Sequence, residues 1–531
     1  MTSTMRPRRH VRGRLKAGGL VSAPVLAVII ALLFQASPLS ARSAAHHPAA
    51  RPDRAATVSR DGDEHGRPRN ARDTAGDRPA ATTPPKAAAG THLMVDLASA
   101  PSLRTVRSWQ RTSPYRAIGV YVHVAHAVDD RHDKVQRHLT ASWVKQVQAG
   151  GWHVLPIYLG AQAPARCQLG RFHAMSASPL AAQRQGIAAA DVAARSTARL
   201  GLTTVPVMYD MEQYGAGCGN AVRAFFLGWT ARLHQLGRLS GIYGAPTSLG
   251  RDLLGAGPDY ARPDVLWSVT ANGVASTALH ELPRQAWRGQ RANQFALDVT
   301  RRYGGHRLAV DDSAVDDGVW TLVRARTADT TPPVLTVGDT AAAGTRKRTR
   351  LRWAAVDEAS ARVSYQTRVR RTVAGAPVSA WTAPAPANRT MPVRLRQGEQ
   401  VCVRVRATDS AGNSSGWIRR CTSRLADDRT LRHQGKRARG WRRARARGAY
   451  RGTVTTAKRR HAKLRLGHAE PGAVGVLLRG RGAVTVRSAG KRVGVLRAGG
   501  LRWARLRHAG AVTLTATSAK VSVDGYVLSP R

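Results

Sequence analysis

The chain has 531 residues and carries 84 Lys and Arg against 32 Asp and Glu, a formal net charge of +52. This length exceeds what a single core ordinarily holds, which excludes a one-domain protein and favours two to four domains. So large a positive charge calls for an anionic partner, and the candidates are nucleic acid, anionic lipid or an anionic cell-wall polymer.

The first 43 residues have the order of an export signal. Basic residues from Arg6 to Lys16 precede an apolar run, Leu20 to Phe34, and small residues such as Ala41 and Ser43 follow. This order predicts a signal peptide over residues 1–43 and a secreted or cell-wall-associated protein. The apolar run is short for a membrane span, so a membrane is expected as a partner only if the signal stays uncleaved as an anchor.

Residues 44–90 are rich in Ala, Arg, Pro, Asp and Thr and contain almost no large apolar residue. Such a segment cannot bury a core, so we expect a disordered linker. The whole chain has four cysteines, an even and low number that suits two structural disulfides in an oxidising compartment.

Residues 91–325 alternate strand-like and helix-like patterns. Helical periodicity is clearest at Ser102–Gln110, Thr140–Ala149, Leu180–Leu200 and Ala221–Leu236. We expect strands at Leu93–Asp96, Ala117–Val122, His153–Leu159, Val205–Asp210, Ser240–Tyr243, Asp264–Val269, Ala292–Phe295 and Leu308–Asp311. Eight strands with helices between them predict an α/β domain of the (β/α)8 TIM-like barrel class. A doubly wound open sheet is the competing layout, although no Gly-rich phosphate loop follows the first strand.

Acidic side chains stand at the ends of several predicted strands. Asp96 ends the first strand, Asp210 and Glu212 end the fourth, and Asp311 ends the eighth, while Gln294 lies in the seventh. In a barrel the strand ends converge on one face, where the sites of such enzymes lie. These side chains are therefore expected to meet in one pocket.

The pair Asp210 and Glu212 carries the predicted chemistry. Residues two apart on a strand point to one face, so the two carboxylates should lie near each other, as in retaining glycosidases. Mutual repulsion raises one pKa, and the longer Glu212 is predicted to be the general acid while Asp210 stays ionised. Tyr209 and Tyr214 flank the pair and are expected to form a sugar-stacking wall.

Two ordinary explanations stay open at this point. An Asp-x-Glu pair at a strand end is most often a solvated loop or a helix cap. His123 and His126, with acidic residues up to Asp133, could hold a metal or could simply form a polar rim loop. Because glycoside hydrolysis needs neither a metal nor a cofactor, none is expected.

Several motifs together resemble an actinobacterial glycoside-hydrolase-like family of unknown function, itself similar to the Chalaropsis-type lysozymes. The motifs are Val95-Asp96, Pro101-Ser102, Ser113-Pro114-Tyr115, Pro156-Ile157-Tyr158-Leu159-Gly160, Gln162-Ala163-Pro164, Tyr209-Asp210-Met211-Glu212, Ser240-Gly241-Ile242-Tyr243 and Gln294-Phe295. The resemblance covers about residues 91–323. It implies a barrel with a lysozyme-like acidic pocket acting on peptidoglycan.

The resemblance also assigns individual residues. Asp96, Asp210, Glu212 and Asp311 match positions that would line the pocket, and Tyr158, Tyr243 and Gln294 lie in matching motifs and are expected to bind substrate. Relatives often carry a cysteine where this chain has Ala98. Its absence leaves Cys167 and Cys218 as the implied pair between two loops.

Residues 334–425 are strand-like throughout and resemble a fibronectin type III module. An alternating strand beginning at Val401 runs into Asp409-x-Ala411-Gly412-Asn413, which is typical of a hairpin. The resemblance implies that Cys402 and Cys421 link adjacent strands. We expect the module to act as a spacer or an adhesive unit.

Residues 440–531 show short apolar runs interspersed with Arg, which predicts a second, basic β-sandwich of the carbohydrate-binding kind. Residues 331–531 contain 43 basic and 9 acidic side chains, whereas residues 91–330 contain 26 and 17. The two trailing modules are therefore expected to bind anionic wall polymers, and this binding should fade with salt. Nucleic acid is the less favoured partner because it is scarce outside the cell.

Together these patterns predict an exported cell-wall protein with a lysozyme-like glycoside hydrolase barrel acting on peptidoglycan or a related N-acetylated glycan. The alternative is a non-catalytic wall-binding or adhesin-like protein that uses the same pocket to hold glycan. Fold and site likeness do not establish turnover, so both functions stay open here.

Overall fold

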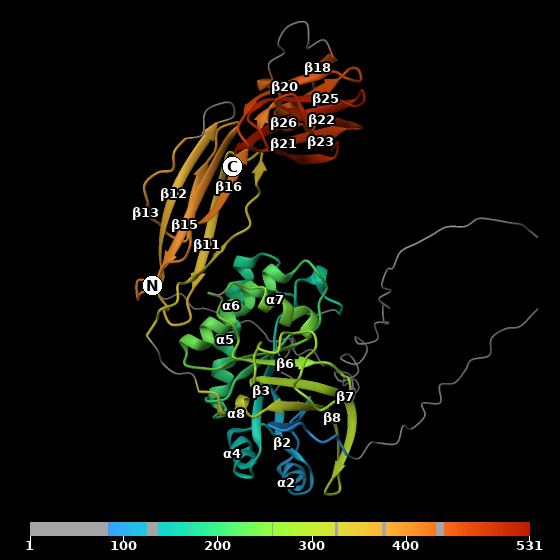
Figure 1. Ribbon diagram of the computed structural model, residues 1–531, viewed down its shortest axis with the longest axis vertical. Coiled ribbons are helices and arrows are strands. Elements are labelled where there is room, and N and C mark those ends of the chain that lie inside the picture. The colour runs from blue at the N-terminus through green and yellow to red at the C-terminus, as the bar shows by residue number, and fades with distance from the viewer. Residues whose placement is uncertain are drawn as a thin grey trace, which may run out of the picture.

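The computed structural model describes residues 83–124, 136–170, 172–257, 259–323, 328–373, 379–431 and 440–530. The predicted signal peptide, most of the predicted linker and the segment from His126 to Asp133 lie outside these described residues. Figure 1 shows a barrel with helices around it, then a long all-strand part, then a second all-strand part at the far end.

The barrel is closed by eight strands that neighbour one another in chain order. The strands are β1 (Thr91–Leu97), β2 (Tyr115–Val124), β3 (His153–Leu159), β4 (Val207–Asp210), β5 (Ser240–Gly244), β6 (Val265–Val269), β7 (Arg291–Tyr303) and β8 (His306–Asp316). The helices are α2 (Leu103–Thr112), α4 (Ala141–Ala149), α5 (Pro179–Arg199), α6 (Gly219–Gln235), α7 (Arg251–Leu254) and α8 (Gly318–Thr321). The TIM-like class is confirmed, and a doubly wound open sheet is excluded by the closure.

The last strand differs from the regular pattern. β1 to β7 pair in parallel, but β8 runs antiparallel to both β7 and β1. Only Gly304 and Gly305 separate β7 from β8, and both have positive φ, 51° and 83°. Two such glycines make a tight hairpin turn and leave no chain for a crossover helix. The eighth strand of a regular (β/α)8 barrel would be parallel, and that expectation is wrong here.

Local signals set the helix bounds and the core. The Ser102 hydroxyl accepts a hydrogen bond from the Thr105 backbone N–H at 3.3 Å and so caps α2. Trp109 of α2 and Trp229 of α6 are buried in the layer between helices and barrel. Gly228 of α6 lets α5 and α6 pack closely, because it has no side chain. A Cβ at position 228 would lie 2.2 Å from the backbone oxygen of Gln183 in α5 and would clash with it.

The next part consists of two sheets. One has the order β10-β16-β15-β12-β13 and the other β14-β11-β9. The strands are β9 (Val334–Val337), β10 (Ala343–Gly344), β11 (Arg348–Val356), β12 (Ser364–Val373), β13 (Ala385–Pro386), β14 (Thr390–Arg394), β15 (Glu399–Thr408) and β16 (Ile418–Arg424). Leu351, Trp353 and Val403 are among the side chains that fill the space between the sheets. Cys402 and Cys421 face each other across β15 and β16 and form a disulfide.

The final part pairs a sheet of order β18-β19-β26-β21-β24, joined by β17, with a sheet of order β20-β25-β22-β23. The strands are β17 (Ala426–Asp427), β18 (Trp441–Arg445), β19 (Thr453–Ala457), β20 (Lys463–Ala469), β21 (Gly472–Gly480), β22 (Ala483–Ser488), β23 (Lys491–Arg497), β24 (Gly500–Leu506), β25 (Gly510–Ala516) and β26 (Val521–Pro530). Strand alternation buries Leu464 and Leu466 and exposes Lys463 and Arg465 between them. The positive charge therefore lies on the outer faces.

The barrel and the neighbouring module share a small junction. Gln235, at the end of α6, donates a hydrogen bond to the backbone oxygen of Asp357 at 2.7 Å. The His234 ring nitrogens lie 2.8 Å from Glu358 and 2.9 Å from Asp264. Val356 packs against apolar side chains of α6. These contacts tie the end of α6 to the loop after β11.

Two further observations bear on where the chain works. Both disulfides, Cys167–Cys218 and Cys402–Cys421, are formed, which indicates a protein that folds in an oxidising compartment. Within the described residues, no helix has the length and apolar character needed to span a bilayer.

Candidate active site

A narrow pocket lies at the end of the barrel where the parallel strands finish. Its walls come from all eight strands and one loop, so it draws on the whole circumference of the barrel. The lining residues are Asp96, Tyr121, Ile157, Asp210, Glu212, Tyr243, Trp267, Gln294 and Asp311. The structure thus brings together the four carboxylates that the sequence placed at strand ends.

Asp96 and Asp311 occupy one side of the pocket. They face each other in the register of β1 and β8. The Gln294 amide nitrogen donates to Asp96 at 3.1 Å and to Asp311 at 3.1 Å, and its carbonyl oxygen accepts from the Tyr243 hydroxyl at 2.7 Å. One amide group, that of Gln294, therefore bridges the carboxyl groups of Asp96 and Asp311.

Asp311 lines the pocket, but its position within β8 differs from the expected one. A parallel eighth strand would have ended there, but β8 is antiparallel and Asp311 lies in its middle, beside the exit of β1. The next residue, Asp312, points to the opposite side, where Arg301 donates to it at 3.1 Å and the Tyr115 hydroxyl at 2.6 Å. Alternation along the strand thus separates a pocket carboxylate from a buried ion pair.

Asp210 and Glu212 form the other side. Asp210 is the last residue of β4, Met211 turns into the core, and Glu212 follows in the loop. The Tyr121 hydroxyl donates to Asp210 Oδ2 at 3.1 Å, while Asp210 Oδ1 is buried and has no hydrogen-bond partner. An unpartnered carboxylate oxygen is unfavourable inside a protein and is common where a ligand completes the site.

Gln162 fixes the loop that carries Glu212. It is 1% exposed, its amide nitrogen donates to the Asp210 backbone oxygen at 2.8 Å, and its carbonyl oxygen accepts from the Glu212 N–H at 2.7 Å. Both hydrogen bonds go to backbone atoms. Gln162 therefore positions the two carboxylates without contacting them directly.

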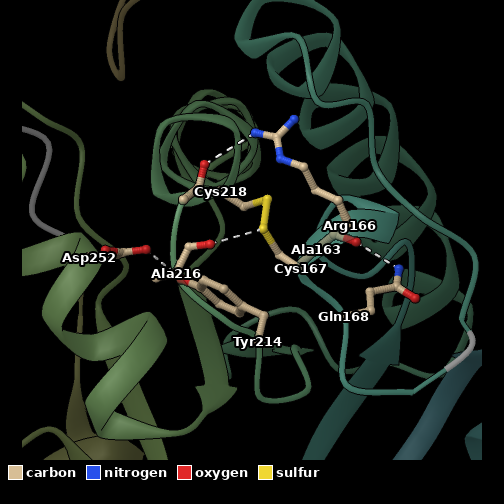
Figure 2. Close-up of a disulfide and its surroundings, with 9 residues drawn as sticks. Ala163, Arg166, Cys167, Gln168, Tyr214, Ala216, Cys218 and Asp252 are labelled. Carbon is tan, nitrogen blue, oxygen red and sulfur yellow. Dashed lines mark hydrogen bonds between the residues drawn. A yellow bond between two sulfur atoms is a disulfide. The ribbon is translucent and has the colours of Figure 1, made fainter.

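A disulfide closes the rim on the same side. Figure 2 shows Cys167, from the loop after β3, bonded to Cys218 at the start of α6. The Gly215 N–H donates to the Cys167 backbone oxygen at 2.7 Å, and the Tyr214 hydroxyl donates to Asp252 at 2.8 Å. The loop after β3 and the loop after β4 are thus joined just beyond the segment that holds Glu212.

A glycine makes room for the pocket floor. Gly119 of β2 pairs with Asp96 of β1, and a Cβ at position 119 would lie 2.8 Å from the Asp96 Cβ and 3.1 Å from Ile157 Cδ1. Any larger residue there would displace the Asp96 carboxylate. The barrel interior is therefore shaped around this acid.

The electrostatics of the pocket are strongly one-sided. Among the described residues that line it, none is Lys, Arg or His. Burial, reinforced by the neighbouring Asp210 charge, raises the pKa of Glu212 to about 8. Burial likewise raises the pKa of Asp210 to about 6 and of Asp311 to about 7. The pKa of Asp96 is raised by burial and then by Asp311.

These shifts make the stability of the barrel depend on pH. A carboxyl group whose pKa is raised by folding stabilises the native state fully below its unfolded pKa, near 4, and loses that contribution as pH rises through its folded pKa. A one-unit difference in pKa corresponds to about 1.4 kcal/mol. The stabilising contribution of Glu212 to the native state is therefore lost between about pH 4 and about pH 8.

Glu212→Gln should remove the free-energy cost of ionising a buried carboxyl group at high pH. We expect the variant to melt at a higher temperature than wild type at pH 8.5 and to lose that advantage at pH 5, as measured by thermal unfolding. Glu281 is exposed, so Glu281→Gln is the matched control and should follow wild type at both pH values. Parallel pH curves for wild type and Glu212→Gln would show that Glu212 titrates normally.

Three tyrosines expected at the pocket lie elsewhere. Tyr209 is fully buried, donates its hydroxyl to the Ala161 backbone oxygen at 2.7 Å and packs edge-on against Phe225 and Trp229. Tyr214 is 6% exposed and bonds Asp252, and Tyr158 is stacked on His123. None of the three lines the pocket, so the structure has no stacking wall made of Tyr209 and Tyr214. Tyr243 and Gln294 do line it.

No role at the pocket was assigned to Tyr121 or Gln162 from the sequence. Tyr121 lies late in β2, and Trp267 is the middle residue of β6. Position near a strand end could have identified Tyr121. Trp267 is 1% exposed and donates its ring N–H to Ser313 at 3.1 Å, so it forms pocket wall and core at once.

The pocket is tight. It leaves about 10 Å³ for the centres of water-sized molecules, room for about one water. The pocket as it stands is therefore too small to enclose a sugar ring.

Comparison with known proteins agrees with this geometry. Residues 107–315 match the family model described as Rv2525c-like, glycoside hydrolase-like domain. No curated protein matches the chain.

Among solved structures, the chain is similar to the catalytic domain of endolysin ply40 from bacteriophage P40 of Listeria monocytogenes, at 12% identity and TM-score 0.27 over 44% of this chain and 97% of that one. It is similar to an engineered protein at 13% identity and TM-score 0.34, over 58% and 86%. It is also similar to CsCBM6-3 from Clostridium stercorarium in complex with cellobiose, at 14% identity and TM-score 0.17, over 20% and 93%. Likenesses of this size say nothing about substrate. The family match does place an Rv2525c-like, glycoside hydrolase-like domain over residues 107–315 of the chain.

Proposed function

We propose that the barrel hydrolyses a glycosidic bond of peptidoglycan or of a related N-acetylated glycan. The observation that carries the proposal is the pocket in which Asp96, Asp210, Glu212 and Asp311 meet without a basic side chain among the described lining residues. Such a cluster weakens the fold, so it is better explained by a reaction than by packing.

Glu212 is the proposed general acid. Its raised pKa keeps it protonated near neutral pH, so it can donate a proton to the linkage oxygen as the bond breaks. Asp210 has the lower pKa of the two and is the proposed carboxylate that stabilises the positive charge developing on the sugar. Tyr121, which donates to Asp210, favours its ionised form.

The alternative is a barrel that holds glycan without cleaving it. The narrowness of the pocket supports this alternative, because a hydrolase must also admit the attacking water beside the sugar. The unpartnered oxygen of Asp210 supports ligand binding in either case.

A second proposed function is adhesion to anionic wall polymers through the trailing modules. Along β11 the side chains alternate, so Arg348, Arg350 and Arg352 are exposed while Leu351 and Trp353 are buried. The exposed arginines line a shallow groove. A row of guanidinium groups at strand spacing suits a phosphate-bearing polymer, and its binding would be screened by salt.

We also propose that the protein is exported and stays with the cell wall. The order of charges and apolar residues in residues 1–43 supports export, and the two disulfides agree with it. The strand order of the module after the barrel supports its assignment as fibronectin type III-like, a spacer between the barrel and the basic end.

Zymography of the full chain on purified peptidoglycan tests the first proposal. We expect a cleared zone at near-neutral pH. Sedimentation of the protein with the same peptidoglycan, with and without its anionic polymers and over a range of salt, measures binding separately. Binding without any clearing would favour the non-catalytic alternative.

A further inference from the structure

A second group of carboxylates lies far from the pocket, at the junction between the barrel and the next module. Asp329 precedes β9, Asp357 follows β11 and Asp409 follows β15. One oxygen of each lies within 4.8 Å of the others. Three segments that are distant in sequence thus bring their acids to one point.

The charges of this group are not neutralised by the protein. Asp357 is 3% exposed and Asp409 is 7% exposed. Within the described part of the chain, neither they nor Asp329 forms an ion pair with Lys or Arg, although the protein carries a net charge of +52. Burying anionic groups without a cationic partner is strongly unfavourable.

One oxygen in the group is left without any partner. Asp409 Oδ1 accepts a hydrogen bond from the Asn413 N–H at 2.9 Å, but its Oδ2 is buried and has none. The side chain is more than nine-tenths buried, so bulk water does not compensate it. An orphaned carboxylate oxygen beside two more carboxylates indicates a missing cation.

The surrounding groups hold the carboxylates in place. Asp357 Oδ1 accepts from the N–H groups of Ala359 and Ser360 at 2.9 and 2.6 Å, and the Ser360 hydroxyl donates to Asp329 at 3.0 Å. The Asn413 amide donates to the Asp329 backbone oxygen at 3.0 Å. The acids are therefore oriented before any ion arrives.

We propose that Asp329, Asp357 and Asp409 bind a calcium ion. All the donors are carboxylate oxygens, which hard divalent cations prefer over softer metals. Calcium accepts irregular oxygen shells, whereas magnesium demands a near-ideal octahedron that three separate loops would hardly provide.

The site would fix how the barrel sits on the module. Asp329 belongs to the segment that connects the two, and Asp357 accepts the hydrogen bond from Gln235 of α6 through its backbone oxygen. Glu358, the next residue, contacts His234. A bound ion would join the connecting segment to the loop that already touches the barrel, and so would hold the pocket at a set orientation to the basic modules.

Calorimetric titration of the full chain, stripped with a chelator, tests the proposal with calcium and magnesium chloride as probes. We expect one calcium ion per chain with a dissociation constant in the range of about 10⁻⁵ to 10⁻³ M, and a higher melting temperature in calcium than in chelator. Asp409→Asn and Asp329→Asn should each weaken binding by about tenfold or more. Asp339 is exposed on the same module, so Asp339→Asn is the matched control and should bind as wild type does.

Thermal unfolding in chelator keeps the variants interpretable. Asp409→Asn relieves repulsion, so it should melt no lower than wild type without calcium while losing the calcium-induced shift. The proposal is overturned if wild type binds no calcium at millimolar concentration or binds magnesium more tightly. Equal calcium affinity in wild type, Asp409→Asn and Asp329→Asn would overturn it as well.

Discussion

Glu212→Gln is expected to lower the rate of glycan hydrolysis by about 10² to 10⁴-fold, the contribution typical of a general acid. The amide keeps the size of the side chain but has no proton of suitable pKa to donate. Because the pocket is too small to enclose a sugar ring, most contacts to a glycan would lie outside it and binding should change little. The loss should therefore fall on kcat and not on KM. Initial rates on soluble peptidoglycan fragments measure both.

Glu281→Gln supplies the control, because it makes the same change at an exposed position. It should leave both parameters as in wild type. A wild-type kcat in Glu212→Gln would show that Glu212 is not the general acid. The remaining candidates would be Asp96 and Asp311, whose pKa values are also raised by burial.

Replacing Cys167 and Cys218 together by Ser should destabilise the barrel by about 2–4 kcal/mol, because the bond closes a loop with a sequence separation of 51 residues. For a domain of this size the melting temperature should fall by roughly 5–15 °C. The two rim loops would also separate more freely, so the carboxylates of Asp210 and Glu212 would be less well placed. Calorimetry and hydrolysis assays on the same sample measure the two effects.

Cys402 and Cys421 give the matched control for that variant. The same pair of substitutions there removes a bond between paired strands of the neighbouring module. It should lower the stability of that module and leave hydrolysis unchanged. If both double variants reduce hydrolysis equally, the effect comes from general loosening and not from the rim of the pocket.

The barrel could be predicted from the sequence because its signals are local. The hydrophobic period locates α5 within one residue of the expected Leu180–Leu200, and each of the eight expected strands overlaps a strand of the barrel. The direction of the last strand was missed although the signal is present. Gly304 and Gly305 stand between two strand patterns and leave only a hairpin turn.

The pocket could be predicted only in part. Position at a strand end predicts that Asp96, Asp210 and Glu212 meet. Strand alternation, however, turns Tyr209 to the face opposite to Asp210, away from the pocket. Asp311 enters from the middle of an antiparallel strand, a position that no strand-end argument describes. Gln162 acts through backbone atoms, which leave no trace in a sequence pattern.

The calcium site shows the other limit of a single sequence. Asp329, Asp357 and Asp409 follow no shared motif, and each alone resembles an ordinary loop acid. Only the packing of three connections at one end of the module brings them together.

Chemical analysis of the products released from purified peptidoglycan tests the central claim most directly. If the barrel is a glycoside hydrolase, digestion by the full chain creates new reducing ends on the sugar chains, in step with the material that it solubilises, and Glu212→Gln does not. Solubilised material without new reducing ends would mean that a peptide or amide bond is cut, and would contradict the proposed reaction.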